Sequence, residues 1–351
     1  MSRRDRTLFS APFDARSLRT SGPPVAVLRD VAFGCNGAAA MAVSENGTLV
    51  YASGYVRGSL MDLSRLARIG SKGEVEILPF DPDSFGRVAM PSPDGRSLAV
   101  ITSDGAVWVY DLARRIRRAL ALGKRRAQGY AVSWSPDGRS IAYSASSEGS
   151  QGFGIYRQAA DGSGVPEELV PPGEEAYALA SAPDGSSFVS TEFAAHPGLW
   201  LRSLDGKSKA SKIVEGFVAG ASFSPDGRWL AYDLQNSDGW QVLMMPMSGD
   251  GPRVPLATGA RFPRWSPDGR SVYYRQGDAL VRIPIPAGDH PEPGAPETLF
   301  KMPLRGYAVA PDGNAFYAFV DFGDSGIVKE LHLVTNWFTE LEALTSPQAA
   351  K

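Results

Sequence analysis

The sequence has little of the chemistry that most metal and redox sites use. It holds one cysteine, Cys35, and three histidines scattered along 351 residues at His196, His290 and His332. A single cysteine cannot form a disulfide within the chain, and histidines so far apart lack the spacing of metal ligands. The sequence therefore predicts no metal site, and nothing in it indicates a cofactor.

The sequence also lacks a strong net charge and long apolar runs. Its formal net charge is −2, which gives no global field to hold nucleic acid or an anionic membrane. No stretch reaches the roughly 20 apolar residues that span a bilayer, and no apolar segment of a signal peptide follows the first basic residues. We expect a soluble protein, cytoplasmic as the sequence is written, with no membrane span and no nucleic-acid partner.

Turn-forming residues are abundant, with 38 glycines and 27 prolines. One turn motif, Ser-Pro-Asp-Gly or a variant, recurs seven times at intervals of 42 to 48 residues. Such a period is typical of repeat architectures. The seven copies are Ser44-Glu45-Asn46-Gly47, Ser92-Pro93-Asp94-Gly95, Ser135-Pro136-Asp137-Gly138, Ala182-Pro183-Asp184-Gly185, Ser224-Pro225-Asp226-Gly227, Ser266-Pro267-Asp268-Gly269 and Ala310-Pro311-Asp312-Gly313.

Each copy of the motif predicts a tight hairpin turn. Proline presets φ at the first corner, and glycine adopts the left-handed conformation that closes the hairpin. An apolar, β-branched or aromatic stretch follows every turn, as at 97–102 and 229–234, and most repeats continue with two more strand-like stretches. Four strands in each repeat are typical of a propeller blade. We predict an all-β fold: a seven-bladed β-propeller of four-stranded antiparallel blades, with six or eight blades as the alternative.

The last repeat lacks a clear fourth strand, and the segment 24–31 before the first repeat can supply it. Closing the ring with this N-terminal strand removes an exposed sheet edge. The alternative is that the first 37 residues form a loose arm. The predicted organisation is an N-terminal arm and closing strand at 1–38, the propeller at 39–340 and a polar tail at 341–351.

The repeated Ser-Pro-Asp-Gly-Arg turn followed by an apolar strand resembles the TolB-like, or WD-like, propeller repeats of bacteria. Four segments, 8–14 with 23–31, 44–51 and 333–338, further resemble the C-terminal propeller of bacterial transmembrane serine/threonine kinases. This resemblance implies a sensor or docking role, extracytoplasmic if the chain belongs to a longer membrane kinase. The sequence departs from that family because it contains neither a kinase domain nor a membrane helix.

The position seven residues before each turn aspartate, or before Asn46 in the first copy, should lie where the innermost strands enter the central channel. It holds three arginines and two tyrosines that could bind a carboxylate or phosphate group. The alternative is that some of these residues pair with acidic residues of neighbouring loops. The candidate binding residues are Arg87, Tyr130, Tyr177, Arg261 and Arg305, with alanine at the two other copies, Ala39 and Ala219.

Other motifs have simpler explanations. Asp321-Phe322-Gly323, Gly323-Asp324-Ser325-Gly326 and Gly206-Lys207-Ser208 lack the partner motifs that kinases, serine proteases and phosphate loops require.

A cluster of basic residues predicts a charged blade edge that prevents edge-to-edge pairing, or alternatively a docking patch for an acidic partner. It comprises Arg114, Arg115, Arg117, Arg118, Lys124, Arg125 and Arg126.

These observations predict a non-catalytic, monomeric binding or interaction module, and not an enzyme. Its partner would be a protein, a peptide or a small anionic ligand, held at the channel mouth. Two alternatives stay open: a regulatory domain detached from a serine/threonine kinase, and a hydrolase or lyase with its active site in the channel.

Overall fold

A computed structural model describes residues 7–20, 22–32, 39–54, 63–150, 152–173, 175–193, 196–204, 209–249, 251–289, 291–321 and 328–345. The chain forms two compact units. Unit 1 comprises Met1–Leu63 with Asp321–Lys351, and unit 2 comprises Ser64–Val320. These boundaries differ from the predicted division, in which 39–340 formed one propeller and the N-terminal 38 residues formed an arm. Among the described residues there is no helix with the length and apolar character needed to cross a membrane.

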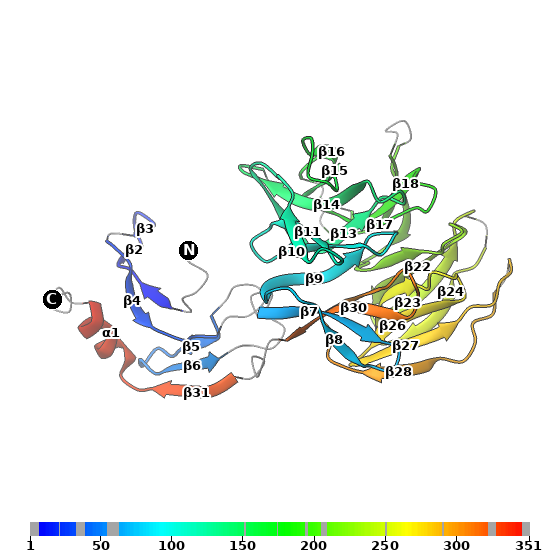
Figure 1. Ribbon diagram of the computed structural model, residues 1–351. Coiled ribbons are helices and arrows are strands. Elements are labelled where there is room, and N and C mark those ends of the chain that lie inside the picture. The colour runs from blue at the N-terminus through cyan, green and yellow to red at the C-terminus, as the bar shows by residue number, and fades with distance from the viewer. Residues whose placement is uncertain are drawn as a thin grey trace. The chain divides into compact units, whose positions relative to one another are not determined.

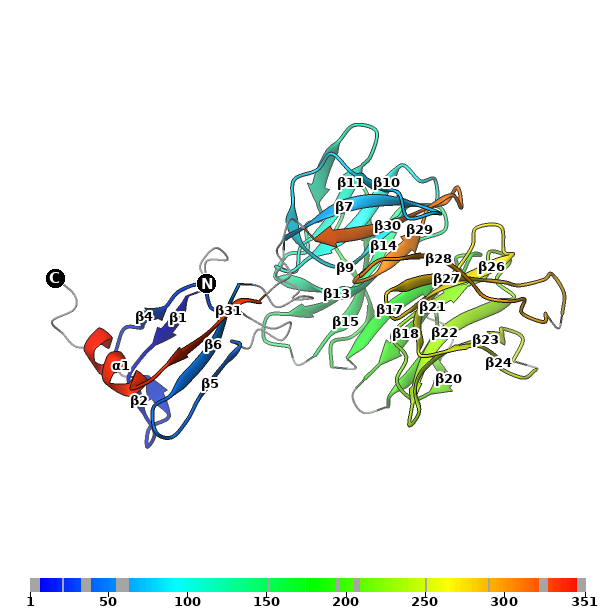
Figure 2. The same ribbon diagram turned by 90° about the horizontal axis from the view of Figure 1, so that it is seen from below.

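Unit 2 is a β-propeller (Figures 1 and 2). We group its described strands into six blades of four strands: four blades are separate four-stranded antiparallel sheets, and the strands of the other two belong to one eight-stranded sheet. We number these blades 1 to 6, and each blade begins at its innermost strand. Blade 1 is β9 (Asp83–Pro91), β10 (Ser97–Thr102), β11 (Val107–Asp111) and β12 (Ile116–Ala119); blade 2 is β13 (Arg125–Trp134), β14 (Ser140–Ser147), β15 (Gly154–Ala159) and β16 (Glu167–Val170); blade 3 is β17 (Ala176–Ser181), β18 (Ser187–Glu192), β19 (Gly198–Ser203) and β20 (Ser211–Glu215).

The remaining three blades follow the same antiparallel order. Blade 4 is β21 (Ala221–Phe223), β22 (Trp229–Asn236), β23 (Gly239–Pro246) and β24 (Val254–Thr258); blade 5 is β25 (Ala260–Trp265), β26 (Ser271–Gln276), β27 (Ala279–Pro284) and β28 (Glu297–Lys301); blade 6 is β29 (Tyr307–Val309), β30 (Ala315–Asp321), β7 (Leu63–Gly70) and β8 (Val75–Ile77). Blade 6 therefore joins strands from the two ends of unit 2, which closes the ring.

Six of the seven predicted turns form a closed ring at one end of the propeller. Their glycines all have φ between 69° and 71°, the left-handed region that glycine adopts without strain. A Cβ added to each glycine would lie 3.5 to 3.8 Å from the nearest atom of a proline in the preceding turn. The glycine of blade 1, Gly95, meets Pro311 of blade 6 in this way, so the series of contacts returns to its start.

The blade count and the closing strand differ from the prediction. The first turn, at 44–47, lies in unit 1, where β5 (Met41–Val43) and β6 (Leu49–Gly54) form a three-stranded sheet with β31 (Val328–Val334). The described strands of the propeller thus match the alternative count of six blades, not seven. The ring is closed by β7 beside β30, whereas β4 (Val25–Leu28), in the segment expected to close it, pairs with β1 (Leu8–Ser10).

Unit 1 also contains β2 (Phe13–Asp14) paired with β3 (Arg19–Thr20), and the helix α1 (Trp337–Thr345). The helix begins against the turn between β5 and β6. The backbone N–H of Trp337 donates to the carbonyl of Gly47 at 2.7 Å, and the Trp337 side chain is 4% exposed. Helix α1 thus occupies part of the segment 341–351 that the sequence predicted to be a polar tail.

The inner strands of the propeller have one face of large side chains and one face of small side chains. Trp134, Phe223 and Trp265 are buried between blades. On the small face, serine hydroxyls accept hydrogen bonds from the backbone of the next blade: Ser133 from Ser181 N–H at 3.1 Å, and Ser222 from Trp265 N–H at 3.1 Å. Small polar side chains therefore allow neighbouring inner strands to approach closely and be joined.

Candidate functional site at the channel mouth

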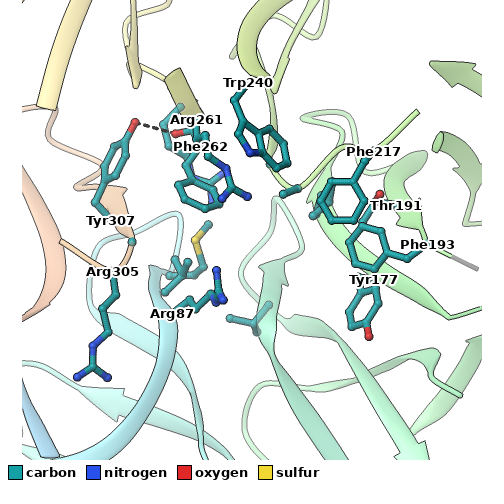
Figure 3. A pocket seen from close by; sticks show the side chains of 18 residues that line it. Arg87, Tyr177, Thr191, Phe193, Phe217, Trp240, Arg261, Phe262, Arg305 and Tyr307 are labelled. Carbon is teal, nitrogen blue, oxygen red and sulfur yellow. Dashed lines mark hydrogen bonds between the residues drawn. The ribbon is translucent and has the colours of Figure 1, made fainter. Parts of the chain in front are cut away.

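A cavity of about 340 Å³ lies at the end of the channel away from the turn ring (Figure 3). Each of the six inner strands, or the residues just before it, contributes to the lining. Gly306 allows blade 6 to approach blade 1 here, because a Cβ at this position would collide with the carbonyl oxygen of Arg87. The cavity is therefore the channel mouth on which the sequence argument placed its candidate residues.

Four of the five candidate residues line this cavity: Arg87, Tyr177, Arg261 and Arg305. The side chain of the fifth, Tyr130 on β13, lies outside the described residues. Figure 3 shows the guanidinium groups of Arg87 and Arg261 pointing into the same space, whereas that of Arg305 points away from it. Counting seven residues back from each turn thus found residues that line the cavity, but the three candidate arginines do not all point into it.

The guanidinium group of Arg261 is held between two aromatic rings. It lies 3.7 Å from the ring centroid of Trp240 and 4.5 Å from that of Phe262. Stacking of this kind fixes the plane of the guanidinium and favours its cation. Burial lowers the pKa of Arg261, the charges of Arg87 and Arg275 lower it further, and Asp233 opposes them. The mouth thus gathers positive charge in a partly desolvated space.

The carboxylate that opposes the lowering of the Arg261 pKa, Asp233 on β22, is bonded to backbone N–H groups. It is 0% exposed and accepts hydrogen bonds from the N–H groups of Ala219 at 2.7 Å, Gly220 at 2.8 Å and Phe262 at 2.9 Å. Burial raises the pKa of this carboxyl, and the three backbone donors oppose that rise. Asp233 does not line the cavity; it holds the loops that form the cavity.

Phe262 has a backbone conformation that a bulky residue seldom adopts, with φ of 57°. Two hydrogen bonds hold it there. Its N–H donates to Asp233, and its carbonyl accepts from the hydroxyl of Tyr307 at 2.9 Å. Blades 4, 5 and 6 are thereby joined at one residue beside Arg261, which fixes the geometry of the mouth.

Aromatic residues that the sequence argument did not select connect the candidate Tyr177, across the cavity from Arg261, to Trp240, which stacks on Arg261. Ring centroids are separated by 5.0 Å between Tyr177 and Phe193, 4.5 Å between Phe193 and Phe217, and 5.5 Å between Phe217 and Trp240. Tyr177, Phe193, Phe217 and Trp240 thus form one continuous series of ring contacts. Phe193 and Phe217 lie outside the strands, so counting back from the turns could not find them. The only feature of the sequence that could have indicated them is a large apolar ring close to the end of a strand.

Arg264 connects the mouth to a second cavity at the other end of the channel. It lines both spaces, and its Nη1 donates to the carbonyls of Ala221 at 3.0 Å and Pro263 at 3.3 Å. The second cavity, of about 290 Å³, is walled by prolines of the turn ring. A positive charge therefore lies deep in the channel as well as at its mouth.

The described lining of the mouth offers few groups for acid-base or nucleophilic chemistry. It contains no histidine, cysteine, aspartate or glutamate. The hydroxyl of Thr191 donates to the carbonyl of Val218 at 2.7 Å, and that of Tyr307 is bonded to Phe262. Burial raises the pKa of Tyr307 far above its usual range. No group of three or more His, Cys, Asp or Glu side chains in the described ranges could hold a metal ion.

The basic cluster, which extends from the outer part of blade 1 to the first residues of β13 in blade 2, is partly neutralised. Arg117 pairs with Asp83 at 3.1 Å, Lys124 pairs with Glu148 at 3.2 Å, and the guanidinium of Arg125 lies over Tyr156 at 4.6 Å. These contacts agree with a charged blade edge. Residues 206–208 and 322–326, which carry most of the motifs set aside above, lie outside the described residues.

Neither protein-family models nor curated proteins match this chain. Solved structures do match the chain. A protein assigned as TolB from Agrobacterium tumefaciens is 21% identical with a TM-score of 0.60, and the match covers 74% of this chain and 99% of that one. For TolB from Acinetobacter baumannii the identity is 18%, the TM-score 0.51 and the coverage 79% and 68%.

A protein assigned as a 6-phosphogluconolactonase from Bacteroides uniformis is 14% identical with a TM-score of 0.50, and the match covers 78% of this chain and 96% of that one. Identities this low show the fold and leave the function open, because one fold supports many functions. The chain has a β-propeller fold like that of TolB.

Proposed function

We propose that the propeller is a non-catalytic binding module whose channel mouth holds an anionic ligand, either a small molecule or an acidic segment of a protein. One observation carries the proposal: Arg87 and Arg261 point into a cavity whose described lining contains four arginines and no carboxylate (Figure 3). Desolvated guanidinium groups bind carboxylates and phosphates strongly. An anion there would offset the burial, and the repulsion by Arg87 and Arg275, that lower the pKa of Arg261.

The chemistry of the lining supports binding over catalysis. A hydrolase or lyase needs a general acid or base, or an activated nucleophile, close to its substrate. In the described lining, Thr191 and Tyr307 donate their hydroxyl protons to backbone carbonyls. Both hydroxyls thus stabilise the mouth, and neither is paired with a base that could activate it.

A second proposal is that this propeller serves as the sensor or docking part of a serine/threonine kinase. The segments that resemble the kinase-associated propellers, 8–14, 23–31, 44–51 and 333–338, all belong to unit 1. They thus mark a separate structural unit and not a blade of the ring. Reading the gene upstream for an in-frame kinase domain tests this proposal, and a gene without one contradicts it.

The binding proposal is tested by thermal shift with acetate, phosphate and sulfate at constant ionic strength. We expect at least one anion to raise the melting temperature of the parent protein, and Arg87→Gln and Arg261→Gln to lose that rise. Arg139→Gln, an exposed arginine beside a turn at the other end of the propeller, is the matched control and should keep it. If no anion stabilises the parent, or if Arg261→Gln responds like the parent, the proposal is wrong.

A further inference from the structure

The channel mouth has two chemically different halves. Figure 3 shows Arg87 and Arg261 on one side of the space, with Phe217, Phe193 and Tyr177 across from them. The arginines come from blades 1 and 5, whereas the aromatic residues come from blade 3 and the connection into blade 4. The propeller therefore places Arg87 and Arg261 on one wall of the cavity and Tyr177, Phe193 and Phe217 on the opposite wall.

The aromatic half is a continuous surface and not a set of separate rings. Phe193 and Phe217 stack at 4.5 Å with an interplanar angle of 19°, and Trp240 meets Phe217 edge-on at 71°. Phe217 is 37% exposed, a high value for a phenylalanine that is packed among other rings. Such a surface gains both apolar burial and ring-to-ring contact when a flat ligand covers it.

The cationic half is held rigid before any ligand arrives. Trp240 and Phe262 fix the plane of Arg261, while Asp233 and Tyr307 fix the backbone of Phe262. A guanidinium already oriented loses less freedom when it binds a carboxylate or phosphate. Arg264, which lines both cavities, adds a further positive charge deeper in the channel.

We infer that the mouth binds an amphipathic anion: an aromatic ring joined by a short linker to one carboxylate or phosphate. The acid group lies between Arg87 and Arg261, and the ring lies against Phe193 and Phe217. A cavity of about 340 Å³ is at the small end of the range of roughly 300 to 1,000 Å³ for ligand sites. The inference rests on the proposed anion-binding function and specifies its ligand class.

Three related probes separate the ring from the charge: phenylacetate, acetate and phenylacetamide. Titration calorimetry with the full chain should show phenylacetate binding at least tenfold more tightly than either acetate or phenylacetamide. Equal affinity for acetate and phenylacetate would overturn the role of the ring and leave the anion-binding function standing. Binding of phenylacetamide as tight as that of phenylacetate, or no binding of any anion, would overturn the anion-binding function as well.

Matched variants assign the two halves. Phe217→Leu should weaken phenylacetate at least fivefold and leave acetate unchanged, whereas Arg261→Gln should weaken both anions. Phe153→Leu is the control, because Phe153 lies 5.4 Å from Tyr177 but does not line the cavity. An effect of Phe153→Leu as large as that of Phe217→Leu would contradict the assignment of the ring to this wall.

The same chemistry occurs at the C-terminus of a peptide that ends in phenylalanine. N-acetyl-Gly-Gly-Phe with a free carboxylate therefore distinguishes the two sources of the ligand. Tighter binding of this peptide than of phenylacetate would identify a chain terminus as the source. Weaker binding would identify a free aromatic acid, and both results support the inferred ligand class.

Discussion

The backbone N–H of Phe262 donates to Oδ2 of Asp233 at 2.9 Å, and this bond joins blade 5 to blade 4 at the channel mouth. The bond holds a bulky residue at a φ of 57°, beside the arginine that stacks on Trp240. A buried carboxylate with three backbone partners is thus the anchor of the mouth. Its removal should affect both stability and ligand binding.

Asp233→Asn tests this anchor. The amide places an N–H₂ group where Oδ2 accepted the Phe262 N–H, so two donors would face each other in a buried site. We expect a loss of about 1 to 3 kcal/mol in the free energy of unfolding, measured by chemical denaturation. Asp238→Asn, in the exposed hairpin between β22 and β23, is the control and should be near neutral. Comparable stabilities of the two variants would contradict the role of Asp233.

The turn ring predicts a loss of stability in acid. The pKa values of Asp94, Asp137 and Asp268 are lowered first by hydrogen bonds from the serine two residues earlier. A carboxyl whose pKa is lower in the folded state stabilises the fold above its unfolded pKa of about 4, and this contribution disappears as the pH falls through the folded value. We therefore expect unfolding free energy to fall progressively below pH 4.

Ser266→Ala isolates one of these turns. It removes the Oγ that donates to Asp268 at 2.6 Å, so the stability at neutral pH should fall by about 1 kcal/mol and the acid-dependent loss should become smaller. Ala310→Ser is the reverse change, because that turn has alanine at the same position, and it should stabilise the protein. A pH dependence unchanged by Ser266→Ala would contradict this account of the turns.

The left-handed glycines of the ring give a third prediction. At Gly269, with φ of 69°, an added Cβ would be in ordinary contact with Pro225 at 3.5 Å, so the cost of a side chain is set by the backbone. Gly269→Ala should destabilise the protein by about 1 to 2 kcal/mol. Asparagine tolerates this conformation better, and Gly269→Asn should cost less. A larger loss for asparagine than for alanine would show that contact with Pro225 decides the cost.

A buried ion pair in blade 3 gives the fourth prediction. Arg202 pairs with Glu192, and their side chains are 14% and 8% exposed. Arg202→Met leaves the Glu192 carboxylate buried without this partner, which should cost about 3 to 5 kcal/mol. Lys124→Met removes an exposed pair, in which the side chains are 85% and 73% exposed, and should change stability by less than about 1 kcal/mol. Equal losses of stability in Arg202→Met and Lys124→Met would contradict the claim that burial makes the Arg202–Glu192 pair important.

Local chemistry predicted the hairpins well, because the Ser-Pro-Asp-Gly turn depends on residues adjacent in the chain. It could not predict which sheet a hairpin joins. The turn at Gly47 has glutamate in place of proline, and a Cβ on this glycine would lie 3.0 Å from Phe338, not beside the proline of a neighbouring turn. The sequence predicted segment 24–31 as the closing strand, whereas the structure has β7 beside β30. No turn motif directly precedes β7, so its pairing with β30 depends on contacts between residues distant in sequence.

The candidate site was predictable in part. Counting back from the turns places Arg87 and Arg261 at the mouth because every inner strand has the same register relative to its turn. The direction in which Arg305 points, and the position of Phe193 and Phe217 in the connections, depend on loop conformations that no repeat specifies. Sequence periodicity therefore located the cavity and one of its two halves.

The central claim is that an aromatic acid binds with its acid group on Arg87 and Arg261. The most direct measurement is a crystal structure of the protein soaked with 4-bromophenylacetate, in which anomalous scattering locates the bromine. We expect a bromine peak beside Phe193 and Phe217, with the carboxylate within hydrogen-bond distance of both guanidinium groups. Bromine found only outside the cavity, or found at the arginines with the carboxylate against the aromatic wall, would contradict the account.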